Sequence, residues 1–180
     1  MSTHTHATID DLYRVEGKAE LVHGEIVQMS PTGGMPGRTA GIIYAHLFQY
    51  ERQYKSGYAF PDNVGFRVHL PHRESFSPDA AWYVGAIHMG FPDGAPVFAV
   101  EVRSEYDYGP AAERAMAAKR ADYFAAGTLV VWDVDLLSPH MIKAYKMSAP
   151  DHSVIFRPGE IADAEPAVPG WHMAVDELCA

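Results

Sequence analysis

Short apolar runs separated by turn residues occupy the middle of the chain and predict a series of strands. We expect strands at 58–60, 65–70, 79–84, 97–103, 128–134 and 141–146. Two longer segments have apolar residues at helical spacing instead, at 38–53 and from Pro110 to Gly127. Proline suits the first position of a helix and glycine its end, so Gly57 and Gly127 should terminate these two helices. This order of elements indicates a mixed α/β sheet with few helices.

The two ends of the chain are less regular. A short helix is expected at 9–15, then a hairpin at 20–29 with its turn at His23-Gly24, and then a loop at 30–37. Breaks are expected at 71–75 and 89–94. The proline-containing tail should form loops or edge structure. We therefore expect one domain over 1–180, with a core at about 9–147 and a C-terminal tail at 148–180.

Composition narrows the class of protein. A length of 180 residues suits a single domain with a real core. No apolar run approaches the length of a membrane span, and the N-terminus lacks the regions of a signal peptide. The single Cys179 excludes an internal disulfide framework and a cysteine zinc cluster. The default expectation is a cytoplasmic protein.

The charge balance weighs against a non-specific nucleic-acid binder. The formal net charge is −9, whereas such binders normally present a basic surface. Net charge does not determine fold or exclude a local site. A local basic patch remains open, with candidates Arg38, Arg52, Lys55, Arg103, Arg114, Lys119 and Arg120.

Two acids stand in otherwise apolar strands. Asp79 follows Ser77-Pro78, and Glu101 interrupts the run from Val97 to Val102. Strand alternation places Glu101 and Arg103 opposite the apolar Phe98 face, so both should point into a cleft. If the strands are neighbours, Asp79 and Glu101 can converge on one hard cation, and the Val102 carbonyl adds an oxygen. Alternatively, each acid pairs with an arginine or caps a turn.

The second long helix contributes a lysine. Ala112, Met116, Lys119 and Tyr123 form a single stripe, so Lys119 occupies an inward position. Its stem can pack on the sheet while the ammonium reaches solvent. Alternatively, the ammonium faces the two acids, where it would stabilise an anionic transition state or orient a metal-bound water.

Taken in order, these pieces resemble the Uma-two-type family of putative restriction endonucleases, a branch of the PD-(D/E)XK nuclease superfamily. The matching segments are 20–26, 29–31, 77–79, 100–104, 119–123 and 127–135. The resemblance implies a restriction-endonuclease-like mixed central sheet flanked by helices, with Mg²⁺ bound by Asp79 and Glu101. It implies that Glu20 is the first acidic residue of the site and that Lys119 takes the lysine role.

Two positions depart from the pattern. Arg103 stands where the simplest superfamily motif has a lysine, and it cannot serve as a base. Pro36 stands where relatives often carry a histidine.

The leading hypothesis is a Mg²⁺-dependent endonuclease that hydrolyses DNA, with Mn²⁺ as a substitute metal. In it, Asp79, Glu101 and the Val102 carbonyl hold the metal, Lys119 and Glu20 assist, and Arg103 contacts phosphate. The alternative is a catalytically inactive nuclease-like binding or accessory module, favoured by the net charge of −9 and by Arg103. A homodimer is expected, with apolar surface near Trp171 or Phe156 serving self-association.

Overall fold

A six-stranded mixed sheet forms the centre of the protein. The computed structural model describes residues 6–179. The strand order is β10–β9–β8–β7–β6–β3, and β7 and β8 are parallel while the other neighbours are antiparallel. These strands are β3 (Tyr58–Phe60), β6 (Ala80–Tyr83), β7 (Phe98–Val102), β8 (Val130–Val134), β9 (Ile142–Lys146) and β10 (Ala149–Phe156).

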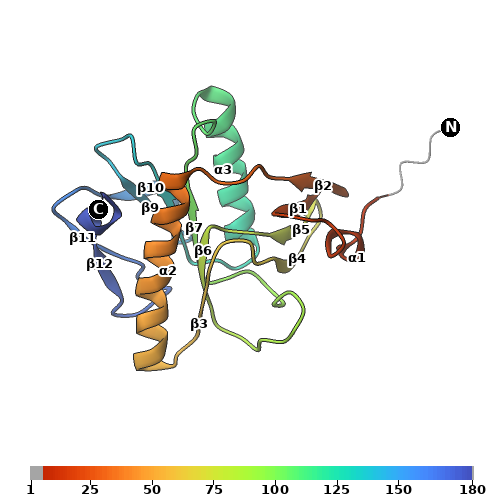
Figure 1. Ribbon diagram of the computed structural model, residues 1–180, viewed down its shortest axis with the longest axis horizontal. Coiled ribbons are helices and arrows are strands. Elements are labelled where there is room, and N and C mark those ends of the chain that lie inside the picture. Colours follow the sequence, from red (N-terminus) through yellow and green to blue (C-terminus); the bar gives the residue numbers. More distant parts are fainter. Residues whose placement is uncertain (1–5, 180) are drawn as a thin grey trace.

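Two long helices lie on opposite faces of this sheet (Figure 1). Helix α2 (Gly34–Tyr54) packs Ile43 and Leu47 into the main core together with Phe98 and other residues of the apolar face of β7. Helix α3 (Pro110–Ala125) packs Tyr123 on the other face, against a second cluster. The predicted mixed α/β sheet flanked by helices is therefore confirmed. Of the helices within residues 6–179, none is long and apolar enough to cross a membrane.

A smaller antiparallel sheet, ordered β2–β1–β5–β4, lies beside the central one (Figure 1). The predicted hairpin is present, and its turn residues His23 and Gly24 have φ values of 53° and 72°. The short helix α1 (Ile9–Leu12) packs against β1 through a small apolar cluster. The strands are β1 (Ala19–Val22), β2 (Glu25–Gln28), β4 (Phe66–Leu70) and β5 (Arg73–Phe76).

Strand β5 lies where the sequence predicted a break. Its residues Arg73 and Ser75 are polar but buried. The Ser75 hydroxyl accepts a hydrogen bond from the Leu21 backbone N–H at 2.8 Å, which satisfies it in the interior. The strand was missed because its buried positions are polar and receive their partners from distant β1.

Helix α2 begins earlier than predicted, and its C-cap is another residue than expected. It begins at Gly34, so Pro36 lies in its first turn, where a missing N–H costs no helical hydrogen bond. It ends at Tyr54, and Lys55 rather than Gly57 is the C-cap, in the left-handed conformation. Gly57 instead makes room for a neighbouring side chain, because a Cβ atom there would lie 2.7 Å from the Trp82 ring.

The C-terminal segment contributes directly to the main core. A ribbon of β11 (Ile161–Asp163) and β12 (His172–Ala174) is followed by the 3₁₀ helix η1 (Val175–Cys179). Trp171 is 3% exposed, and its ring lies 5.4 Å from that of Trp132. The expectation that Trp171 offers exposed surface for self-association is therefore wrong. Phe156 is half-buried against the same core.

Candidate active site

Asp79 directly precedes β6, and Glu101 lies on β7, which pairs with β6, so the condition for convergence of the two acids is met. Ala80 of β6 pairs with Val100 of β7, and this antiparallel register, continued by one residue, places Asp79 opposite Glu101. The Asp79 N–H donates to the Val100 carbonyl at 2.9 Å. In turn, Asp79 Oδ2 accepts a hydrogen bond from the Val102 N–H at 2.7 Å. The end of β7 thus fixes the orientation of the Asp79 carboxylate.

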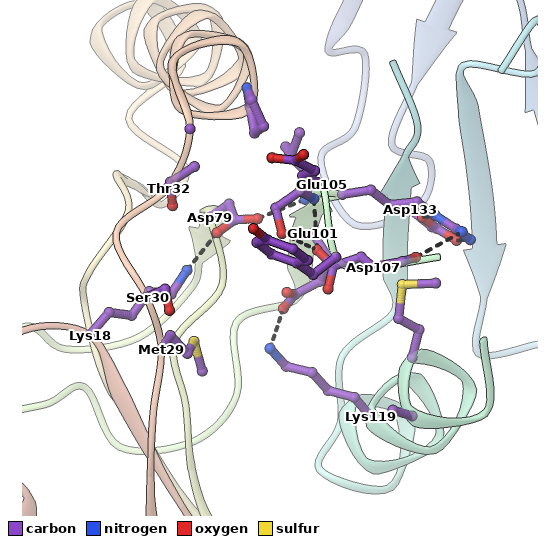
Figure 2. Close-up of a pocket in the computed structure, with 18 of the residues that line it drawn as sticks. Lys18, Met29, Ser30, Thr32, Asp79, Glu101, Glu105, Asp107, Lys119 and Asp133 are labelled. Atoms are coloured by element: carbon purple, nitrogen blue, oxygen red, sulfur yellow. Dashed lines mark hydrogen bonds and ion pairs between the residues drawn. The ribbon is translucent and has the colours of Figure 1, made fainter. Parts of the chain in front are cut away.

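Lys119 joins Glu101 to Glu20. Its ammonium lies 2.9 Å from Glu101 Oε1 and 2.9 Å from Glu20 Oε1 (Figure 2 shows the first contact). Helix α3 therefore aims Lys119 at acids from two strands, β7 and β1, which belong to different sheets. Of the two alternatives for this side chain, the structure selects the one in which the ammonium faces the acids.

Lys119 carries a positive charge at neutral pH. Burial favours loss of the proton, but the carboxylates of Glu101 and Glu20 outweigh it and raise the pKa of Lys119 well above its usual value. A permanently charged ammonium cannot accept a proton. Its chemical capacity is to stabilise negative charge and to donate hydrogen bonds.

Glu20 is held by several donors. Burial opposes its charge, but Lys119 and Arg73 lower the pKa of Glu20 below its usual value, helped by the Ser77 N–H at 2.8 Å. Arg73 Nη1 lies 2.7 Å from Glu20 Oε2, and Arg73 Nε donates to Asp122 at 2.9 Å. Glu20 is therefore a buried, ionised acid that orients Lys119.

Glu101 has the opposite electrostatic character. Burial raises the pKa of Glu101, and repulsion from Asp79 and Glu20 adds to this, while Lys119 only partly offsets it. The Tyr123 hydroxyl donates to Glu101 Oε1 at 2.6 Å. A carboxylate whose charge is disfavoured in this way gains most from the arrival of a further cation.

Lys18 is a member of the site that sequence reasoning missed. Its ammonium lies 2.5 Å from Asp79 Oδ1 and 2.7 Å from Asp62 Oδ1, and its side chain is 12% exposed. Figure 2 shows Lys18 and Lys119 approaching the two acids from different sides. Lys18 precedes β1 in an irregular segment, so no strand pattern pointed to it.

Arg103 lines the cavity, but its guanidinium is held by acids. Its Nε and Nη2 donate to the two carboxylate oxygens of Asp133, each at 2.7 Å. Its Nη1 also binds Glu113, and the Arg103 side chain is only 3% exposed. Arg103 thus joins β7 to β8 and to the start of α3, and its predicted phosphate contact stays a prediction.

The charged side chains of the site surround a cavity of about 680 Å³. Asp79, Glu101 and Lys119 lie in its wall, with Lys18 at the same surface (Figure 2). Polar and apolar residues from the loop before α2, from the segment after β7 and from α3 line the rest, including Met29 and Met116. This volume lies within the usual range of small-molecule sites and is large enough for a nucleotide.

The donor chemistry of the cavity fits a hard cation. Asp79, Glu101 and Val102 line it, and Mg²⁺ is commonly held by one or two carboxylates with water completing the shell. Within residues 6–179, no group of three or more His, Cys, Asp or Glu side chains forms a ready-made metal cluster. The arrangement fits a two-carboxylate site whose acids are paired with lysine ammonium groups.

Comparisons with known proteins bear on the family and the fold. A family model described as a putative restriction endonuclease, Uma2, matches residues 8–176. The fold is similar to the crystal structure of a putative nuclease belonging to DUF820 from Anabaena variabilis ATCC 29413. The TM-score is 0.74 at 16% identity, covering 95% of this chain and 96% of the other. No curated protein matches.

Proposed function

The chain belongs to the Uma2 family of putative restriction endonucleases, and from this premise we propose a metal-dependent endonuclease that hydrolyses DNA phosphodiester bonds. One observation carries the proposal. A single ammonium, that of Lys119, bridges Glu20 and Glu101 at 2.9 Å each, beside Asp79 in the same cavity. Acids and a lysine in this relation are what metal-assisted phosphoryl transfer requires.

Asp79, Glu101 and the Val102 carbonyl would hold Mg²⁺, with Mn²⁺ as a substitute. When bound, the ion supplies Lewis-acid polarisation of a phosphate oxygen and a lower pKa for an attacking water. The protein's part is orientation. The Val102 N–H fixes one oxygen of Asp79, and the Tyr123 hydroxyl fixes one oxygen of Glu101.

Lys119 would stabilise the charge that accumulates on the phosphoryl group. It stays protonated, so it acts as a hydrogen-bond donor and point charge rather than as a base. Glu20 would position it, because Arg73 and the Ser77 N–H fix the Glu20 carboxylate. Phosphate contact by Arg103 would require its guanidinium to leave Glu113, which is 54% exposed, while the pair with Asp133 persists.

A DNA substrate, a homodimer and a cytoplasmic location complete the proposal. DNA binding would use basic residues on the helices that border the cavity, such as the exposed Arg38 and Arg114. Strand β10 is an edge of the central sheet, and edge strands are a common place for a second chain to pair. The single cysteine fits a reducing compartment. Light scattering tests the dimer.

The proposal is tested by nicking of supercoiled plasmid with Mg²⁺ or Mn²⁺. Wild type should convert the plasmid to open circles, EDTA should stop it, and Asp79→Asn and Asp79→Ala should be inactive. Asp151→Asn provides a matched control, because Asp151 is exposed on β10, outside the residues that line the cavity. Equal activity of wild type and the Asp79 variants would refute the assignment.

A second candidate function is a nuclease-like binding or accessory module without catalysis. The enclosure of Arg103 favours it, because the residue at the usual lysine position is committed to Asp133 and Glu113. Calorimetric titration with Mn²⁺ separates the two functions. A folded wild-type protein that binds no divalent ion would support the accessory module and exclude the metal-dependent enzyme.

A further inference from the structure

We propose that Lys18 is an internal competitor of the divalent ion: its ammonium occupies Asp79 in the metal-free protein and withdraws toward Asp62 when the ion binds. This inference rests on the proposed metal site at Asp79 and Glu101. It goes beyond that site by assigning Lys18 and Asp62 a shared role in setting how tightly the metal is held.

The contacts of Asp79 give the first argument. Its Oδ2 accepts the Val102 N–H at 2.7 Å, and its Oδ1 holds the Lys18 ammonium at 2.5 Å. Both oxygens of the proposed metal ligand are thus engaged, one of them by a cation. The backbone contact is compatible with metal binding because it orients the carboxylate. The ammonium is not, since it repels an incoming divalent ion at close range.

The position of Lys18 gives the second argument. Its side chain is 12% exposed, and it lies in the wall of the cavity that contains Glu101 and Lys119. Charges this sheltered are screened weakly by salt. The effect of Lys18 on a nearby ion is therefore larger than that of a surface lysine.

Asp62 gives the third argument, because it offers Lys18 a second place. It lies 2.7 Å from the same ammonium, and its side chain is 36% exposed. Its Oδ1 also accepts the Asn63 backbone N–H at 2.7 Å, which holds the carboxylate in place. When the ion takes Asp79, Lys18 keeps Asp62 as its acid partner. Asp62 thereby lowers the cost of moving Lys18.

This arrangement makes two opposite predictions for Mn²⁺ binding. Lys18→Met should bind Mn²⁺ at least tenfold more tightly than wild type, because the competitor is gone. Asp62→Asn should bind it several-fold more weakly, because Lys18 loses its alternative partner and stays on Asp79. Lys18→Arg is the matched control, which keeps the positive charge and should not gain affinity.

A double-mutant cycle separates this role of Asp62 from a general loss of negative charge. If Asp62 acts through Lys18, Asp62→Asn should have little effect in the Lys18→Met background. If it acts only by its charge, the loss in affinity should be the same in both backgrounds, and that result would overturn the role of Asp62.

The experiment is calorimetric titration of the full-length protein with Mn²⁺ alone, for wild type, the single and double variants, and Asp79→Asn. Folding of each is checked by circular dichroism. The Asp62 variant, altered at a partly exposed side chain, tests the idea even if Lys18→Met folds poorly. Mn²⁺ binding that needs Asp79 but is unchanged or weaker in Lys18→Met overturns the inference alone. Absence of Asp79-dependent binding in every variant overturns the proposed function and the inference with it.

Discussion

The two glutamates that share Lys119 should respond oppositely to the same substitution. Glu20 and Glu101 each lie 2.9 Å from the ammonium, and glutamine replaces either with little change in shape. The pKa of Glu20 is lowered, so the folded protein favours its charge. The pKa of Glu101 is raised, chiefly by burial, so the folded protein disfavours its charge. We therefore expect Glu20→Gln to destabilise the protein and Glu101→Gln not to.

The size of the difference follows from the partners. Removing one member of a buried ion pair costs about 3–5 kcal/mol. Glutamine at position 20 can still accept the Ser77 N–H, so we expect a loss of about 3 kcal/mol, at the lower end of that range. For Glu101→Gln we expect a free energy of unfolding equal to or above wild type. At roughly 2–4 °C per kcal/mol for a chain of this size, the two variants should differ by roughly 6–12 °C in Tm.

The assay is urea unfolding with EDTA present, first at pH 7 and then under acid conditions. Glu20 stabilises the fold above its unfolded pKa of about 4.3, and this contribution is lost as pH falls through its lower folded pKa. Glu101 destabilises the fold above its raised folded pKa, and this penalty disappears as pH falls below the unfolded value. The gap between the variants should therefore be larger at pH 7 than in acid and should close once both carboxyl groups are protonated.

Two results would refute this reasoning. One is an equal loss of stability in both variants at pH 7, which would mean that the ion pair with Lys119 dominates at Glu101 as it does at Glu20. The other is a gap that persists after both carboxyl groups are protonated, which would assign the difference to packing rather than to charge.

Three further predictions concern the surroundings of the site. Tyr123→Phe removes the hydrogen bond to Glu101 but keeps the ring in place, so it should cost about 0.5–1.5 kcal/mol in urea unfolding; no change would show that the hydroxyl is unimportant. Arg103→Lys loses the two-point contact with Asp133, so it should lower Tm without raising plasmid nicking; higher activity would mean that the lysine reaches the cavity. Trp171→Ala empties a core position and should cost about 3–5 kcal/mol; a loss below about 1 kcal/mol by the same assay would contradict its place in the core.

The sequence predicted the central sheet well because its strands follow simple hydrophobic patterns. The alternation in β7 is enough to separate the core residue Phe98 from Glu101, and the cluster around Phe98 and Val100 confirms this division. The stripe on α3 likewise placed Lys119 on the inner side. In both cases local periodicity carried the information, because each residue's direction depends only on its own element.

What the sequence did not predict depends on partners distant in the chain. Lys18 lies in an irregular segment just before β1, and its role appears only when Asp79 is brought beside it. Arg73 is buried because Glu20, which is distant in the chain, pairs with it. From the sequence alone, the charged residues of β5 resembled those of a turn. Trp171 resembled a surface residue because it stands in a proline-containing tail. No local pattern reports such contacts, since they arise from the docking of one sheet or ribbon on another.

The division of the charged cluster between two sheets has a consequence for how a newly made chain matures on the ribosome. Glu20 emerges early and can first meet Arg73 when β5 is complete, whereas its second partner, Lys119, follows only with α3. Synthesis proceeds from the N-terminus, so Glu20, Asp79 and Glu101 are all made before the helix that carries Lys119. The cluster is therefore complete only once α3 has been made, and a truncated translation product ending before α3 would contain Asp79 and Glu101 without Lys119.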